Sequence, residues 1–180
     1  WKPEWYMELE EVQSSQRAMS LDMLRSTRSI RTRASTPAEI VQLFDAIAYE
    51  KGAAVLRMIE AWVGEEPFRA GVNAYIGRFK YSNARAEDFW GTLTSSTGKP
   101  VDRVMAGFVD QPGVPLVDVA MRCSAKDHTV SITQVPAAGG VAQPLMWSIA
   151  VCARTPADKV PSMVVVGEPA SDPVGTCPAR

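Results

Sequence analysis

The stretch Leu43–Gly64, LFDAIAYEKGAAVLRMIEAWVG, decides how the N-terminal part of this chain folds. Its apolar residues recur at the spacing of one face of an α-helix; they are Leu43, Ile47, Ala54, Val55, Met58, Ile59 and Trp62. Gly64 is well placed to end that helix. Just upstream, Thr36-Pro37-Ala38-Glu39 is typical of a helix start, because Thr36 can cap a backbone N–H and Glu39 can complete a capping box. The sequence predicts helix from Pro37 to Val63.

Further helices are expected on both sides of this stretch. Spaced apolar residues predict a long amphipathic helix from Trp1 to about Arg25. A basic, Ser/Thr-rich loop follows over 25–35, and we expect its charges to be solvated. Downstream, acidic first turns and Gly or Pro stops predict helices over 65–80, 86–97 and 101–110. Connections of only a few residues are typical of antiparallel, packed helices.

The composition of the chain changes near residue 111. All five Phe and all four Tyr precede it, whereas nine of the 13 Pro follow it. Alternating apolar residues between Pro and Gly predict strands over 116–121, 129–134, 147–152 and 160–166. We therefore expect an α+β protein, with a helical part over 1–113 and part of an antiparallel β-sandwich over 114–180. So few apolar residues follow 113 that the strands must lean on the helical part or on further strands.

The overall composition excludes several classes of protein. The chain has 180 residues, of which 46% are hydrophobic and 22% charged, which argues against disorder. Its net charge of -1 predicts no nucleic-acid partner, and no apolar run is long enough to span a membrane. The chain begins at Trp1 without a signal peptide, so we expect a processed chain or a piece of a longer one.

Histidine and cysteine are too scarce for metal or triad chemistry. His128 is the single histidine, so a two-histidine zinc site cannot form from this chain, and we expect a surface role for it. Cys123, Cys152 and Cys177 include no C-x-x-C pair, which makes a metal site among them improbable. One disulfide with a free thiol and three buried free thiols both remain open.

Tyr49 stands out because of the residues around it. Gly52 and Ala53 follow it by three and four positions and therefore share its face of the predicted helix. The phenol lies beside a surface with almost no side chain, and a glycine inside a helix costs about 0.5–1 kcal/mol relative to alanine. Two interpretations follow: a packed tyrosine beside a close helix crossing, or a phenol that faces space for a ligand.

This stretch resembles the segment around the active-site tyrosine of zinc aminopeptidases of the aminopeptidase N and puromycin-sensitive aminopeptidase family. The family pattern, approximately F-D-x-I-x-Y-x-K-G-A, stands here as Phe44, Asp45, Ile47, Tyr49, Lys51, Gly52 and Ala53. Matching segments continue through 64–71, 81–84, 87–90, 98–101 and 111–115, so the resemblance is strong over about 1–119 and weaker beyond. Departures are Val114 for an aromatic residue, Arg28-Ser29 for His-Pro and Ala48 for Ser.

The resemblance implies a fold and a mechanism. The implied fold is the helical C-terminal half of a thermolysin-like catalytic domain followed by a partial antiparallel β-sandwich. In the family, water activated by zinc attacks the N-terminal peptide carbonyl, and a tyrosine donates a hydrogen bond to the resulting oxyanion. Tyr49 is the implied catalytic residue, and Phe44 is implied to line the pocket for the first side chain of a peptide substrate.

The zinc motif HExxH of the family and its G-x-M-E-N motif do not occur in this chain. We therefore expect Zn in a full-length parent, no metal ligands and no cofactor in this chain, and no activity of the chain alone. The implied partners are a peptide substrate and the remainder of the parent polypeptide. The alternative is a non-catalytic scaffold or protein-interaction module with the same helical and β parts.

Overall fold

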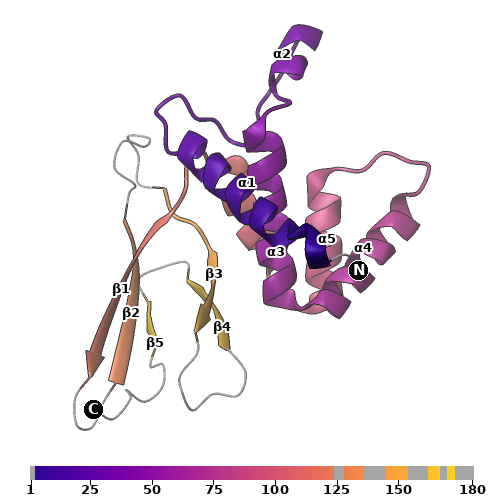
Figure 1. Ribbon diagram of the computed structural model, residues 1–180. Helices are drawn as coiled ribbons and strands as arrows, with labels where there is room; N and C mark the ends of the chain where they lie inside the picture. The colour runs from indigo at the N-terminus through magenta and orange to yellow at the C-terminus, as the bar shows by residue number, and fades with distance from the viewer. Residues whose placement is uncertain (1–2, 124–127, 136–144, 154–161, 167–169, 173–180) are drawn as a thin grey trace.

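The computed structural model describes residues 3–123, 128–135, 145–153, 162–166 and 170–172. Its N-terminal part is helical, as Figure 1 shows. A short 3-10 helix, Pro3–Trp5, and a π-helical turn, Ile47–Lys51, accompany α1 (Met7–Asp22), α2 (Pro37–Gln42), α3 (Gly52–Val63), α4 (Glu65–Phe79), α5 (Ala86–Thr97) and α6 (Val101–Asp110). None of the helices in the described part of the chain has the length and apolar character needed to cross a membrane.

The C-terminal part consists of antiparallel strands. β1 (Leu116–Cys123) pairs with β2 (His128–Val135), which also pairs with β5 (Ala170–Asp172), while β3 (Ile149–Ala153) pairs with β4 (Ser162–Val166). Helices and strands occupy separate parts of the molecule (Figure 1), so the α+β class is confirmed. The four predicted strands are present, whereas β5 was not predicted from the sequence.

The hydrophobic core lies among α3, α5 and α6. On α6, the buried residues Val101, Val104, Met105 and Phe108 follow a spacing of three and four, so one face of the helix packs inward. Ile59 of α3 and Leu93 of α5 are fully buried against them. The apolar spacing predicted for the 43–64 stretch therefore reports the core correctly at Val55, Ile59 and Trp62.

Trp147 anchors the strands to the helical core. Its side chain is buried in the same apolar cluster as the helices, and its backbone N–H and C=O both bond to the Gln134 side chain of β2. Gln111, just after α6, donates to the Met146 carbonyl at 2.9 Å. The strands thus lean on the helical part, as expected from their small apolar content.

Two predicted helices have different boundaries in the structure. The first begins at Met7 rather than Trp1, because Tyr6 adopts a left-handed conformation with φ of 49°. The second is broken: Thr36 and Glu39 form the predicted capping box, but α2 ends at Gln42. Helix resumes only after Asp45, whose side chain accepts from the Ala48 N–H and starts a new helix.

The close approach of α4 and α5 yields a stability prediction. A Cβ at Gly71 would lie 2.6 Å from Cδ2 of Leu93, which is fully buried, so the packing around it would have to shift. We expect Gly71→Ala to lower the free energy of unfolding by about 1–3 kcal/mol. Gly77 lies on the same helix with no atom within 4 Å of such a Cβ, so Gly77→Ala should raise it by about 0.5–1 kcal/mol. Urea unfolding of both variants measures the difference, and equal midpoints would contradict the packing described.

Candidate functional site

Tyr49 lies on the π-helical turn and faces outward. Its side chain is 61% exposed, and that of Phe44 is 64% exposed. The two ring centroids are 6.1 Å apart, with the planes tilted by 31°. None of the described residues hydrogen bonds to the Tyr49 hydroxyl, so this group is a free donor beside an exposed aromatic ring.

The surface next to Tyr49 is open. A Cβ at Gly52 would meet no neighbouring atom within 4 Å among the described residues. The helix crossing that one interpretation of the sequence required is therefore not found there, and the tyrosine is not packed. The phenol faces solvent in the described part of the chain. A π-turn is itself rare and is frequently found at functional sites.

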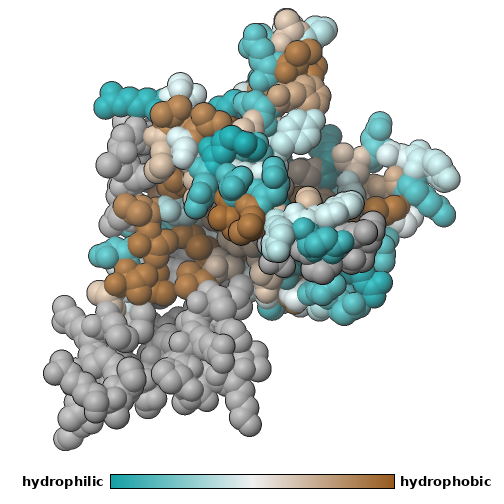
Figure 2. Space-filling view, viewed as in Figure 1, coloured by the Kyte–Doolittle hydropathy of each residue, from teal (hydrophilic) through white to brown (hydrophobic). Residues whose placement is uncertain are grey.

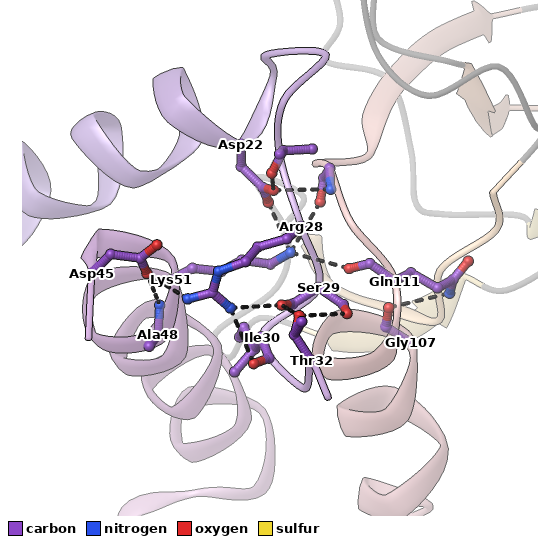
Figure 3. Close-up of polar contacts among 12 residues, drawn as sticks. Asp22, Arg28, Ser29, Ile30, Thr32, Asp45, Ala48, Lys51, Gly107 and Gln111 are labelled. Atoms are coloured by element: carbon purple, nitrogen blue, oxygen red, sulfur yellow. Dashed lines mark hydrogen bonds and ion pairs between the residues drawn. The ribbon is translucent and has the colours of Figure 1, made fainter. Parts of the chain in front are cut away.

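The beginning of the turn is held by Asp45 and Arg28 (Figure 3). Asp45 Oδ1 accepts from the Ala48 N–H at 3.0 Å, and the Asp45 carbonyl accepts from the Tyr49 N–H at 3.0 Å. These are the bonds of an N-cap residue. Arg28 Nη2 donates to the same Oδ1 at 2.7 Å. The backbone of Tyr49 is thus connected to the loop before α2.

The end of the turn is held by a buried ion pair. Lys51 Nζ lies 2.8 Å from Asp22 Oδ2, and the two side chains are 7% and 0% exposed. Lys51 also donates to the carbonyls of Gln111 and Gly113, and Asp22 Oδ1 accepts from the Gly113 N–H and the Thr27 hydroxyl. These bonds join α1, the turn and the segment that leads into β1.

A third contact crosses the outer side of the turn. Arg17 of α1 donates from Nε to both carboxylate oxygens of Glu50 at 2.9 Å. These hydrogen bonds hold the pKa of Glu50 below its usual range and raise that of Arg17. The pair is exposed on the arginine side, so it adds orientation rather than much stability.

An apolar groove of about 300 Å³ opens on another face of the same network. Met19, Met58, Val117 and Ile149 line it, together with Asp22 and Lys51. Neither Tyr49 nor Phe44 borders this groove. It is therefore separate from the exposed pair of rings.

The sequence predicted some of these residues and missed others. Tyr49 and Phe44, the two residues singled out by the resemblance, lie side by side. The basic loop over 25–35 was expected to be solvated, but Arg28 bonds to Asp45, and Arg31 pairs with Glu87 and Asp110. The hydrogen bond from Arg31 lowers the pKa of Glu87. The side chains of His128, Cys123, Cys152 and Cys177 lie outside the described residues, as does the choice between a disulfide and free thiols.

Comparison with known proteins identifies the family. Residues 1–108 match the Peptidase family M1 domain. This chain belongs to peptidase family M1. The M1 chain is 44% identical over 107 residues to probable aminopeptidase 2 of Sulfurisphaera tokodaii, a match that covers 59% of the chain and 14% of that relative. It is 42% identical over 118 residues to leucyl aminopeptidase of Saccharolobus solfataricus, covering 66% of the chain and 14% of the relative.

A yeast relative and a solved structure extend the comparison. Mitochondrial aminopeptidase 2 of Saccharomyces cerevisiae is 44% identical over 120 residues, covering 66% of the M1 chain and 13% of that protein. The crystal structure of Legionella pneumophila aminopeptidase A in complex with aspartic acid has a similar fold, with a TM-score of 0.67 at 21% identity over 95% of the chain and 21% of that structure. The M1 chain thus spans about one seventh of the length of these curated relatives, as the 14% share shows.

Family M1 peptidases in general depend on zinc. Within the ranges that the structure describes, no group of three or more His, Cys, Asp or Glu side chains could hold a metal ion.

Proposed function

We propose that this chain supplies Tyr49 as an oxyanion hydrogen-bond donor to an aminopeptidase that removes N-terminal residues from peptides. The observation that carries the proposal is the free, exposed hydroxyl of Tyr49, placed on a π-turn beside open surface in a chain of family M1. Relatives with 44% and 42% identity are named aminopeptidases, which supports the reaction class.

The chemistry of the phenol suits this role. A tyrosine hydroxyl is a hydrogen-bond donor at neutral pH. When a peptide carbonyl is attacked, negative charge develops on its oxygen, and a donor aimed at that oxygen binds the transition state more strongly than the substrate. Tyr49 belongs to a turn that is held by polar bonds at both ends, so the free-energy cost of reorienting it when the charge develops is small.

Phe44 is proposed to contact the first side chain of the peptide. Its exposed ring lies 6.1 Å from that of Tyr49, so a substrate whose carbonyl reaches the phenol brings its adjacent side chain near the phenylalanine. An aromatic surface of this kind favours apolar side chains. The partners are then the peptide and the rest of a longer polypeptide.

The finer description of the fold belongs to the same proposal. We assign 1–113 to the helical half of a thermolysin-like peptidase domain and 114–180 to part of a β-sandwich. The match of family M1 to residues 1–108 supports the first assignment. The antiparallel strands that begin at Leu116 support the second. The zinc of the family would be bound by residues outside this chain.

Matched peptides test the proposed function. We expect the full-length protein to release the first residue of a peptide with a free amino terminus and to leave its N-acetylated counterpart intact. The 180-residue chain alone should cleave neither peptide and should bind no stoichiometric zinc. Cleavage inside the acetylated peptide, or hydrolysis by the chain alone, would contradict the proposal. An intact free peptide would favour the scaffold alternative.

A further inference from the structure

We propose that Arg28 is a positioning residue that sets where Tyr49 and Phe44 lie. Its guanidinium holds the break between α2 and the π-turn, and through Asp45 it holds the backbone of Tyr49 itself. The inference rests on the proposed function of Tyr49 for its catalytic consequence. The structural part of it stands on contacts of the chain alone.

Arg28 joins the loop before α2 to the segment that follows α2. Nη1 donates to the carbonyls of Ser29 at 2.9 Å and Ile30 at 3.3 Å. Nη2 donates to the Leu43 carbonyl at 3.0 Å and to Asp45 Oδ1 at 2.7 Å. Figure 3 shows the guanidinium between Asp45 on one side and Ser29 and Ile30 on the other. One side chain therefore fastens residues on both sides of Phe44 to the preceding loop.

Packing does little to hold this region in place. α2 has no buried residue, and it projects from the rest of the molecule with apolar side chains on its surface (Figure 2). Phe44 is 64% exposed. Because few apolar contacts restrain the segment, its polar bonds decide its position.

The effect of Arg28 reaches Tyr49 through Asp45. The carboxylate that receives Arg28 also receives the Ala48 N–H, and the Asp45 carbonyl receives the Tyr49 N–H. An N-cap in the wrong orientation frees the first turn of its helix. Tyr49 lies in that first turn, so loss of Arg28 loosens the beginning of the segment that presents the two rings, while Lys51 still holds its end.

The geometry requires an arginine. Its planar fork places two nitrogens toward different acceptors at once, whereas the single ammonium group of a lysine cannot reach the Ser29 and Leu43 carbonyls together with Asp45. Arg28→Lys should therefore keep the charge near Asp45 and lose the link to the loop. This makes it a graded variant between the native chain and Arg28→Met.

Amide hydrogen exchange of the 180-residue chain tests the structural step. In Arg28→Met we expect the Ala48 and Tyr49 amides to exchange about 3- to 30-fold faster, the range for loss of a cap. Arg28→Lys should give a smaller increase. The amides of Ile59 and Leu93, in the core, should be unchanged. Arg33→Met, which alters an exposed arginine of the same loop, should change none of them.

A double-mutant cycle in the full-length protein tests the catalytic step, with alanine 4-nitroanilide as substrate. We expect Arg28→Met to lower kcat/KM by about 10- to 100-fold, the effect of a misplaced catalytic group. If Arg28 acts through Tyr49, adding Arg28→Met to Tyr49→Phe should lower kcat/KM by no more than about threefold further. Fully additive losses would overturn the proposal.

Two exchange results would also overturn it. One is unchanged exchange at Ala48 and Tyr49, and the other is an equal rise at the core amides, which would mean general destabilisation. Failure of the proposed function looks different: Tyr49→Phe alone would then leave kcat unchanged, while the exchange experiment would still decide whether Arg28 holds the turn.

Discussion

Replacing Tyr49 by phenylalanine in the full-length protein should lower kcat by about 10²–10³-fold, or about 3–4 kcal/mol in transition-state free energy, while KM changes little. The substitution removes only the hydroxyl. This hydroxyl is exposed and bonded to none of the described residues, so folding should be unaffected. The loss arises because an oxyanion donor acts mainly in the transition state. Steady-state kinetics with an aminoacyl 4-nitroanilide measure it.

Tyr81→Phe is the matched control, because Tyr81 is a fully exposed tyrosine on the turn after α4. It should leave kcat and KM at their native values. Thermal unfolding of both variants should coincide with that of the native protein. If Tyr49→Phe retains kcat within a few-fold of the native value, Tyr49 is not the oxyanion donor.

Lys51→Met should lower the free energy of unfolding of the chain by about 3–5 kcal/mol, because it leaves the carboxylate of Asp22 buried without a counter-charge. It also removes the donor to the Gln111 and Gly113 carbonyls, which join the helical part to β1. Urea unfolding at neutral pH measures the loss. Adding Asp22→Asn should recover about half of it, because the amide is uncharged and still offers an oxygen to the Gly113 N–H.

Arg57→Met provides the comparison for Lys51. Arg57 lies on α3 and, like Lys51, pairs with a carboxylate of α1, but its partner Glu11 is 3.8 Å away and both side chains are partly exposed. Its removal should cost less than about 1 kcal/mol. Equal losses for Lys51→Met and Arg57→Met would contradict a special role for the buried pair.

The helices and strands were largely predictable because their signals are local. The spacing on α6 and the stops at Gly64 and Gly98 report burial and helix ends directly. The break at 43–45 was not predictable in this way, because apolar spacing continues across it. The break exists because Asp45 caps a new helix and the Leu43 carbonyl is taken by Arg28, fifteen residues earlier.

The candidate site was predictable only where a motif carries it. Tyr49 and Phe44 follow from the resemblance of their stretch, but the sequence alone did not show that both side chains are exposed. The bonds around Arg28 and Lys51 join residues that are far apart in the sequence. Gly113 and Asp22, which both contact Lys51, bond to each other across 91 residues. Such pairings depend on the packing of whole helices, which composition and periodicity do not report.

The π-turn at Ile47–Lys51 has a consequence for how this sequence can change over generations. Its backbone hydrogen bonds join residues five positions apart, one more than in an α-helix. Each helical residue turns the chain by about 100°. Deletion of one residue within the turn would therefore leave the buried face of α3 packed as before. It would rotate Phe44 and Asp45 about the helix axis, away from Tyr49 and Arg28. The single extra residue of the turn thus sets how the exposed segment is rotated relative to the buried face of α3.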